Sequence, residues 1–233
     1  MKKKDVANII KDSLGIEHQK GDETIAESLV AQPKQFRLPT EELSKKNKRN
    51  HVDLYDGYIK SFNKVSAELD GASPEASNSN HSNFRSLKID EVYNLNAVYL
   101  HELYFANISD LNSEITMDSL SFMRLERDFG SFDEWQMDFL GCAQASRCGW
   151  VVTGYNVFTQ SYMNYVIDLH SLNVPIGVFP VIVMDVWQHA YYADYLRDVK
   201  AYTINMMRQL NWSVIERRFE KAEKIASALR ENQ

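Results

Sequence analysis

The chain of 233 residues has few cysteines, no excess of positive charge and no long hydrophobic stretch. Its two cysteines, Cys142 and Cys148, lie on roughly opposite faces of a predicted helix, so we expect free thiols instead of a disulfide. Such sparse cysteine use is typical of a reducing compartment. The net charge of −6 argues against a general affinity for nucleic acid, because that affinity needs a basic face.

No apolar run approaches the ~18 residues that a membrane-spanning helix needs. The sequence begins with Met1-Lys2-Lys3-Lys4, as a signal peptide can, but no continuous apolar stretch follows. We therefore expect a cytoplasmic protein, or part of a soluble assembly, with no signal peptide and no membrane contact. The hydrophobic content of 44% is typical of a globular protein that builds an ordinary core.

The first part of the chain differs from the rest. Val6, Ile9, Ile10 and Leu14 fall at helical spacing and predict a short amphipathic helix, which polar residues follow. We assign residues 1–37 to an N-terminal arm. This arm is either a plain extension or a segment that docks on a partner in a larger assembly.

Two long helical patterns come next. The first runs from about residue 41 to 66, and the second from Asn83 to Ile108. Between them, Gly71–Ser82 is rich in small and polar residues, which is typical of a loop. Two long helices joined by a loop predict an antiparallel α-hairpin, which we assign to residues 38–108.

The second half of the chain mixes helices and strands. A nearly continuous run of apolar, β-branched residues over Gly177–Met184 predicts a buried strand that ends at Asp185. The other patterns predict strands from Gly149 and over Tyr162–Leu169, and helices over Phe132–Arg147, over Trp187–Leu196 and after Asn211. The predicted fold class is α+β: a long N-terminal α-hairpin followed by a C-terminal α/β domain (residues 109–233) with a small antiparallel sheet.

Three of the six histidines stand where a metal site can form. His51 lies on the first predicted hairpin helix and His101 on the second, and His189 follows Asp185 by four residues where the buried strand meets a helix. Imidazole and carboxylate ligands together suit iron, manganese or zinc. A single histidine on an apolar helix face is more often an ordinary core residue, so the pattern alone leaves a structural role open.

Several segments resemble the iron/manganese superoxide dismutases. Asp185–Tyr192, with the sequence DVWQHAYY, resembles the DVWEHAYY signature of that family. Asn94–Asn107 resembles the helix that carries the second metal ligand, and Leu54–Tyr58 resembles the helix that carries the first. The resemblance covers roughly residues 38–230. Further similar segments are Gly130–Asp133, Gly149–Trp150, Asn211–Trp212 and Glu216–Phe219.

This resemblance implies a superoxide dismutase that converts superoxide to dioxygen and hydrogen peroxide. One iron or manganese ion per subunit would cycle by one electron, held by His51, His101, Asp185 and His189. In many members the first ligand lies eight residues before the tyrosine that matches Tyr58, whereas His51 lies seven before it. Either spacing is about two helical turns, so either position can face inward.

The resemblance also implies roles for three residues around the metal. Tyr58 matches a tyrosine at the mouth of the substrate channel, and Trp150 matches an aromatic wall of the pocket. His170 matches a position that many relatives fill with glutamine and some with histidine. Tyr58 and His170 would then supply protons to the reaction. An ordinary turn histidine is the other interpretation of His170.

The sequence departs from the family at the expected subunit interface. Relatives carry a glutamate that reaches across a dimer to a ligand histidine, and here that residue is Gln188. Tyr191 matches a tyrosine that bonds a histidine of the partner subunit, but Leu54 or Tyr55 stands at that histidine's position. We expect a homodimer, or another homo-oligomer, with an altered interface. A structural protein that reuses the fold with weak or no activity is the alternative, and a zinc hydrolase is a third possibility.

Overall fold

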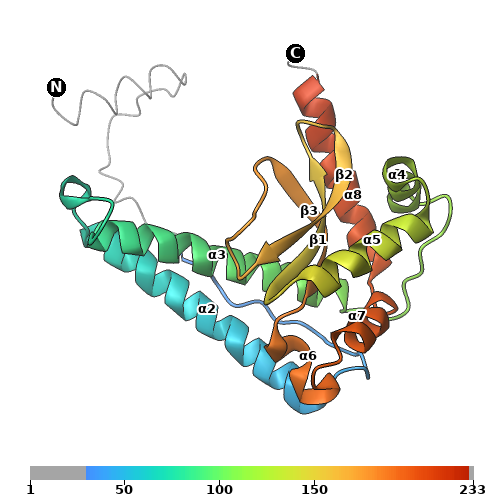
Figure 1. The fold of residues 1–233 in the computed structure, drawn as a ribbon, viewed down its shortest axis with the longest axis horizontal. Helices are drawn as coiled ribbons and strands as arrows, with labels where there is room; N and C mark the ends of the chain where they lie inside the picture. The colour runs from blue at the N-terminus through green and yellow to red at the C-terminus, as the bar shows by residue number, and fades with distance from the viewer. Residues whose placement is uncertain (1–29, 231–233) are drawn as a thin grey trace.

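The structure is a computed structural model that describes residues 30–230 (Figure 1). It confirms the α-hairpin, because helix α2 (Lys45–Gly71) and helix α3 (Asn83–Asn107) lie side by side and run antiparallel. The loop between them contains a short 3-10 helix, η1 (Pro74–Ala76). The amphipathic helix predicted around residues 6–14 lies outside the described residues.

Helix α2 begins four residues later than the sequence pattern predicts. Ser44 is its N-cap, and the Ser44 hydroxyl accepts a hydrogen bond from the backbone N–H of Asn47 at 3.1 Å. Thr40, which lies just before the predicted start of the helix, accepts from the N–H of Glu42 in a turn that precedes the helix. The helix therefore begins at Lys45, because Ser44 supplies the N-cap and Thr40 does not.

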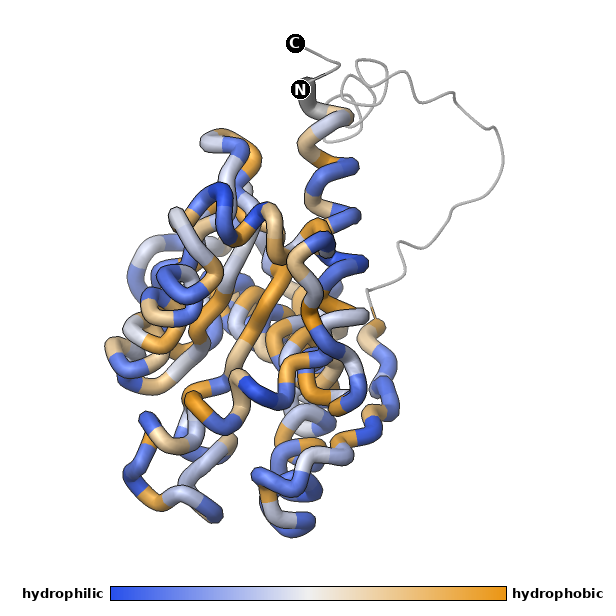
Figure 2. The backbone as a smooth tube through the Cα atoms, turned by 90° about the vertical axis from the view of Figure 1, so that its right-hand side faces the viewer, coloured by the Kyte–Doolittle hydropathy of each residue, from blue (hydrophilic) through white to orange (hydrophobic). Residues whose placement is uncertain are grey.

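The mixed half contains the predicted small antiparallel sheet, and its three strands lie in the order β2-β1-β3. Its strands are β1 (Gly149–Asn156), β2 (Ser161–Asp168) and β3 (Val178–Asp185). The central strand β1 is buried along almost its whole length, and β3 is buried over its second half, where it approaches Asp185. Hydrophobic residues of this region run through the middle of the molecule in Figure 2.

Helices cover the sheet and connect it to the hairpin. Helices α3 and α8 (Trp212–Arg230) contact β3, whereas α5 (Phe132–Ala145) contacts β1 and β2, and α4 (Leu120–Phe129) contacts β2. Two short helices, α6 (Gln188–Tyr195) and α7 (Val199–Met207), follow β3, and α6 packs against α2 (Figure 1). None of the helices within residues 30–230 combines the length and the hydrophobicity that a membrane crossing requires.

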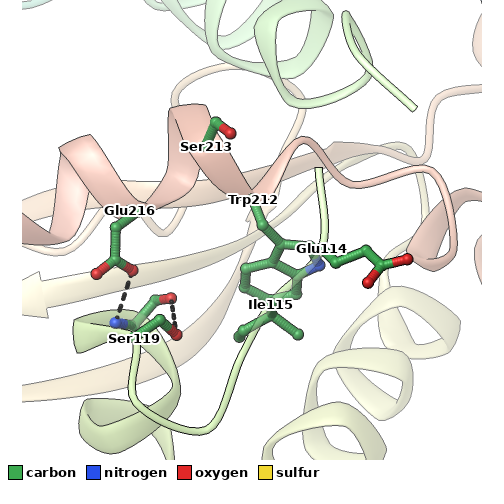
Figure 3. Close-up of a pocket in the computed structure, with 7 residues that line it drawn as sticks. Glu114, Ile115, Ser119, Trp212, Ser213 and Glu216 are labelled. Carbon is green, nitrogen blue, oxygen red and sulfur yellow. Dashed lines mark hydrogen bonds between the residues drawn. The ribbon is translucent and has the colours of Figure 1, made fainter. Parts of the chain in front are cut away.

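Helix α4, which sequence patterns did not predict, is fixed by a residue far along the chain. The Glu216 carboxylate on α8 accepts hydrogen bonds from the backbone N–H groups of Leu120 at 2.6 Å and Ser121 at 2.9 Å. Figure 3 shows Glu216 beside Ser119, the residue that precedes α4. First-turn N–H groups have no partner within their own helix, so this carboxylate satisfies two of them. Ser119 adds an ordinary side-chain cap. The start of α4 therefore depends on α8.

The described part of the predicted arm packs on the hairpin. The backbone of Ala31 donates to the Asn63 side chain at 2.7 Å and accepts from it at 3.0 Å. The ring of Phe36 packs against Tyr55, with ring centroids 6.1 Å apart. Residues 30–37 therefore contribute to the hairpin, and the division of the chain at residue 37 stays a prediction.

Candidate metal centre

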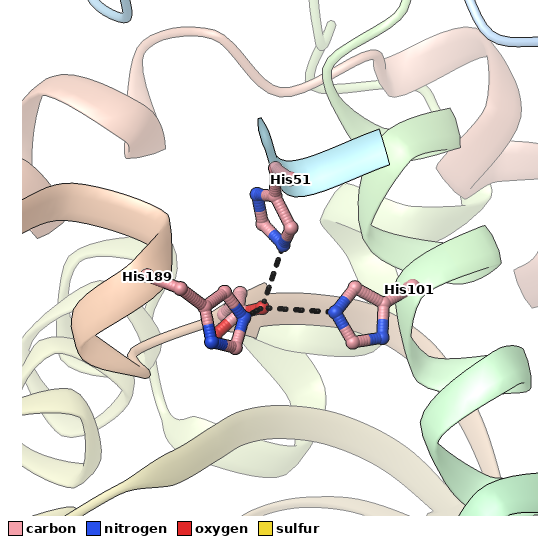
Figure 4. Close-up of side chains that lie close together, drawn as sticks. His51, His101 and His189 are labelled. Atoms are coloured by element: carbon pink, nitrogen blue, oxygen red, sulfur yellow. Dashed lines mark hydrogen bonds and ion pairs between the residues drawn. The ribbon is translucent and has the colours of Figure 1, made fainter. Parts of the chain in front are cut away.

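The four predicted ligands converge on one point. His51 comes from α2, His101 from α3, Asp185 from the end of β3 and His189 from α6. Their potential ligand atoms all lie within 4.8 Å of one another, although 134 positions separate His51 from Asp185. In Figure 4 the three imidazoles point toward the same place. Each of them has its Nε2 atom within 3.8 Å of Asp185 Oδ2.

Each ligand is positioned by the element that carries it. The hairpin brings the rings of His51 and His101 to a centroid separation of 5.1 Å. Strand register then sets Asp185 opposite Trp150 of β1, at the end of the sheet. Helix α6 begins three residues after Asp185 and brings the ring of His189 to 4.9 Å from that of His51.

The spacing of the ligand atoms suits a single shared ion. Asp185 Oδ2 lies 3.1 Å from His51 Nε2 and 3.1 Å from His189 Nε2. It lies 3.8 Å from Nε2 of His101. Two bonds of about 2.1 Å that meet at a tetrahedral angle would place their ligand atoms roughly 3.4 Å apart. The observed separations bracket that value.

His101 gives the clearest sign that a cation belongs in this cluster. Its Nδ1–H donates to the Ala97 carbonyl at 2.7 Å, so Nε2 carries the free lone pair. That Nε2 atom is buried without a hydrogen-bond partner, and it faces the carboxylate of Asp185. Two acceptors that face each other in a buried site repel, unless a cation lies between them. Three nitrogens and one oxygen form a donor set that iron and manganese accept.

The protonation states of the cluster also favour metal binding. Burial lowers the pKa of His51 and lowers the pKa of His101 further, so both imidazoles are neutral near pH 7. Burial opposes the charge on Asp185, but the imidazoles of His189 and His51 hold the pKa of this carboxyl well below its ordinary value. At neutral pH His51 and His101 are therefore uncharged and Asp185 is ionised, which are the charge states that metal ligands need.

The three residues predicted around the metal lie together beside His101. Trp150 Nε1–H donates to His170 Nδ1 at 3.0 Å, and His170 Nε2 lies 2.9 Å from the hydroxyl oxygen of Tyr58. Ring centroids of Trp150, Tyr58 and His170 lie 4.8, 5.4 and 5.9 Å from that of His101. His170 is fully buried, which is unusual for a turn residue, and it follows Leu169, whose backbone adopts a left-handed φ of 57°.

A glycine allows Trp150 to reach this position. A Cβ on Gly149 would lie 1.9 Å from the backbone carbonyl oxygen of Ile167 on β2, so no larger residue fits there. The close approach of the two backbones preserves the register that sets Trp150 opposite Asp185. The pattern Gly149-Trp150 in the sequence is therefore a geometric requirement of the pocket.

The predicted interface residues have different surroundings. Gln188 is exposed and accepts a hydrogen bond from the Cys148 thiol at 3.1 Å. Tyr191 is only 6% exposed and packs on Tyr202 within the same chain, whereas Tyr192 is 55% exposed. Gln188 and Tyr192 are four residues apart on α6 and share one helix face. Tyr192, which sequence comparison missed, is therefore better placed than Tyr191 for contact with another chain.

Two other positions complete the surroundings of the centre. Leu54 and Tyr55 are the two positions that match the interface histidine of relatives, which this chain lacks. Tyr55 is fully buried and donates to Glu102 at 2.9 Å, whereas Leu54 is partly exposed. Sequence patterns also missed a role for Trp187. Its ring stacks on His170 at 5.1 Å and on His189 at 5.7 Å. Its place inside the DVWQHAYY segment was the available signal.

Comparison with known proteins agrees with this geometry. The family model described as iron/manganese superoxide dismutases, C-terminal domain, matches residues 120–218. The chain is 32% identical over 206 residues to the iron superoxide dismutase of Aquifex aeolicus, which covers 86% of this chain and 96% of the relative. It is 32% identical over 180 residues to the iron superoxide dismutase of Aquifex pyrophilus, covering 76% and 84%. The manganese superoxide dismutase of Mycolicibacterium fortuitum is 27% identical over 178 residues, covering 76% and 84%.

Proposed function

This chain belongs to the iron/manganese superoxide dismutase family, and we propose that His51, His101, Asp185 and His189 hold its metal ion. The protein is a superoxide dismutase that uses iron or manganese to convert superoxide to dioxygen and hydrogen peroxide. The unpartnered Nε2 of His101, which faces the Asp185 carboxylate, is the observation that carries the ligand assignment. The survival of all four ligands argues against an inactive structural protein.

The protein holds the ligands in place through their outer atoms. The Ala97 carbonyl fixes the ring of His101, and the backbone N–H of Trp187 donates to Asp185 Oδ1 at 2.8 Å, which leaves Oδ2 directed at the imidazoles. Such outer contacts orient ligands before the ion arrives. When bound, the ion would supply one-electron redox chemistry for the two superoxide ions of each cycle.

We propose that Tyr58 and His170 supply protons for the second half of the reaction. Two superoxide ions and two protons give one dioxygen and one hydrogen peroxide, so protons must enter the pocket in each cycle. Tyr58 is partly exposed, and its hydroxyl is 2.9 Å from the fully buried His170. This pair therefore connects the surface to the metal site. Trp150 and Trp187 cover His170 and keep bulk water out.

We also propose that the subunits associate as a homodimer through the exposed face of α6. Gln188 and Tyr192 are exposed there, and the neighbouring His189 side chain is 25% exposed, so this face lies next to the metal site. Sedimentation equilibrium should give twice the mass of one chain, and Tyr192→Ala should weaken the association. A chain that sediments as a monomer at all concentrations would disprove the dimer.

Two further proposals concern the surroundings of the enzyme. A cytoplasmic location is supported by the free thiols of Cys142 and Cys148. Docking of the N-terminal arm on a larger assembly is supported only by the apolar spacing of Val6, Ile9 and Leu14 in the sequence.

Metal analysis together with a superoxide assay tests the function. Protein expressed with iron and manganese both supplied should carry about one of these ions per chain and should dismutate superoxide. The same batch, stripped by a chelator, should lose the activity and regain it when one of the metals returns. Pure protein that carries neither metal and shows no activity after reloading would contradict the proposal, and stoichiometric zinc would favour a hydrolase.

A further inference from the structure

Asn96 on α3 holds the backbone of His170, and it has no role in the function described so far. Its side-chain amide donates to the carbonyl oxygen of His170 at 2.9 Å, although 74 positions separate the two residues. We propose that Asn96 is a positioning residue, which places the ring of His170 between Trp150 and Tyr58 by fixing its backbone. This proposal rests on the proposed role of Tyr58 and His170 in proton supply.

The chemistry of the two groups sets the direction of this hydrogen bond. A backbone carbonyl can only accept, so the amide nitrogen of Asn96 must face it and the amide oxygen faces away. His170 is fully buried, and a buried carbonyl without a donor costs free energy. Asn96 therefore satisfies a group that an apolar side chain at position 96 would leave without this partner.

The turn that carries His170 lies at the surface and has a strained backbone. Leu169 and Asn173, which lie on either side of His170, have left-handed φ angles of 57° and 64°. Leu169 and Leu172 are 38% and 52% exposed. The N–H of Leu172 and the side chain of Asn173 both donate to Asp168 at the start of the turn. These internal bonds shape the turn, but they do not place it relative to the hairpin.

The bond from Asn96 places the turn against the helix that also orients a metal ligand. The next residue of α3, Ala97, accepts the hydrogen bond that fixes the ring of His101, at 2.7 Å. Two adjacent residues of one helix therefore hold His101 by its ring and His170 by its backbone. The two ring centroids lie 5.9 Å apart, and both rings are positioned relative to the same helix.

Small movements of this backbone matter, because the ring of His170 has a contact at each nitrogen. Nδ1 accepts from the indole of Trp150 at 3.0 Å, and Nε2 lies 2.9 Å from the hydroxyl oxygen of Tyr58. A displacement of about 0.5 Å would take either contact past the usual upper limit of about 3.2 Å. Asn96 therefore acts on proton supply through the position of His170.

The variant Asn96→Leu removes the donor with little change of shape. The two side chains branch at the same atom, and position 96 borders a cavity of about 180 Å³ whose other walls include Tyr99, Leu103 and Val174. A leucine can pack on these side chains, so the variant should fold. Tyr99→Leu is the matched control, because Tyr99 borders the same cavity from the same helix with a side chain that is half exposed.

The indole N–H of Trp150 reports the position of His170 without any activity measurement. In metal-free protein labelled with nitrogen-15 at its four tryptophans, the Trp150 signal is assigned by its loss in Trp150→Phe. Asn96→Leu should make this proton exchange with D2O at least about tenfold faster, and Tyr99→Leu should not. Trp135 is the internal reference, since its buried indole donates to Thr153 of β1, the strand that carries Trp150. An unchanged Trp150 rate, or a change that Trp135 shares, would overturn the positioning role.

Kinetics of the metal-loaded enzyme test the consequence. Asn96→Leu should bind the native amount of metal, lower kcat about fivefold and increase its solvent deuterium isotope effect. Its kcat/KM, which reports encounter and electron transfer, should stay within about twofold of the native value, and Tyr99→Leu should match the native enzyme throughout. A native kcat in an Asn96→Leu protein with fast exchange at Trp150 would overturn the proposal. Failure of the function itself would show differently, as an inactive native protein after metal loading.

Discussion

Replacement of His101 by alanine should abolish tight binding of iron or manganese and lower the rate of superoxide dismutation at least about a hundredfold. The reason is local: among the four proposed ligands, only His101 has a buried ligand nitrogen without a hydrogen-bond partner, and its ring is already fixed by the Ala97 carbonyl. No other histidine among the described residues can replace it, because His170 is engaged by Trp150 and Tyr58 and His81 is exposed in the loop after α2. Elemental analysis of the purified variant, with an activity assay at matched protein concentration, measures both effects.

Two further variants separate loss of the ligand from loss of the fold. His101 is fully buried, so alanine leaves a cavity that can itself cost a few kcal/mol. The larger side chain of His101→Gln fills most of that space and should give a folded protein that still lacks tight metal binding. His81→Ala, in the exposed loop, should keep the native metal content and rate. One equivalent of metal and a native rate in His101→Gln would show that the ligand assignment is wrong.

The hairpin and the three strands could be predicted because each carries its own periodic pattern. Helix α4 could not, since the carboxylate that caps its first turn comes from Glu216, 96 residues after Leu120. Helix α7 was missed for a different reason. Tyr202, Thr203, Met206 and Met207 are buried between α5 and α6, so this short helix shows no clear polar face in the sequence.

Some residues of the candidate site could likewise be predicted from the sequence, and others could not. Asp185 and His189 follow from a signature whose spacing a strand-to-helix turn preserves, and His101 follows from the separate segment Asn94–Asn107. His51 stands one residue away from the common spacing to Tyr58, and the structure shows that its ring still reaches Asp185, at 3.1 Å. Whether an individual side chain is buried or exposed was harder to predict.

Whether Tyr191 or Tyr192 faces outward depends on where α7 packs, because Tyr202 of α7 covers Tyr191. The contact between Asn96 and His170 likewise depends on how α3 packs against a turn 74 positions away in the sequence. No spacing within the helix could reveal it.

Removal of the metal should have a large effect on stability, because the four ligands tie together elements that are distant in the sequence. Helices α2 and α3 form one unit of local contacts, whereas Asp185 and His189 belong to the mixed half of the chain. An ion bound to all four joins the two halves, and the unfolded chain cannot present the same set. Without the ion, the carboxylate of Asp185 stays buried opposite the lone pair of His101, which costs free energy.

We therefore expect metal-loaded protein to be more stable than metal-free protein by about 4 kcal/mol when free metal exceeds its dissociation constant a thousandfold. Urea denaturation of the chelator-stripped protein, before and after addition of iron or manganese, measures this difference. The His101→Gln variant is the matched control, since metal should shift its unfolding midpoint little. Equal midpoints for the loaded and stripped native protein would contradict the four-ligand assignment. A shift of equal size in His101→Gln would instead show that the ion binds elsewhere, because tight binding at this site requires the imidazole nitrogen of His101.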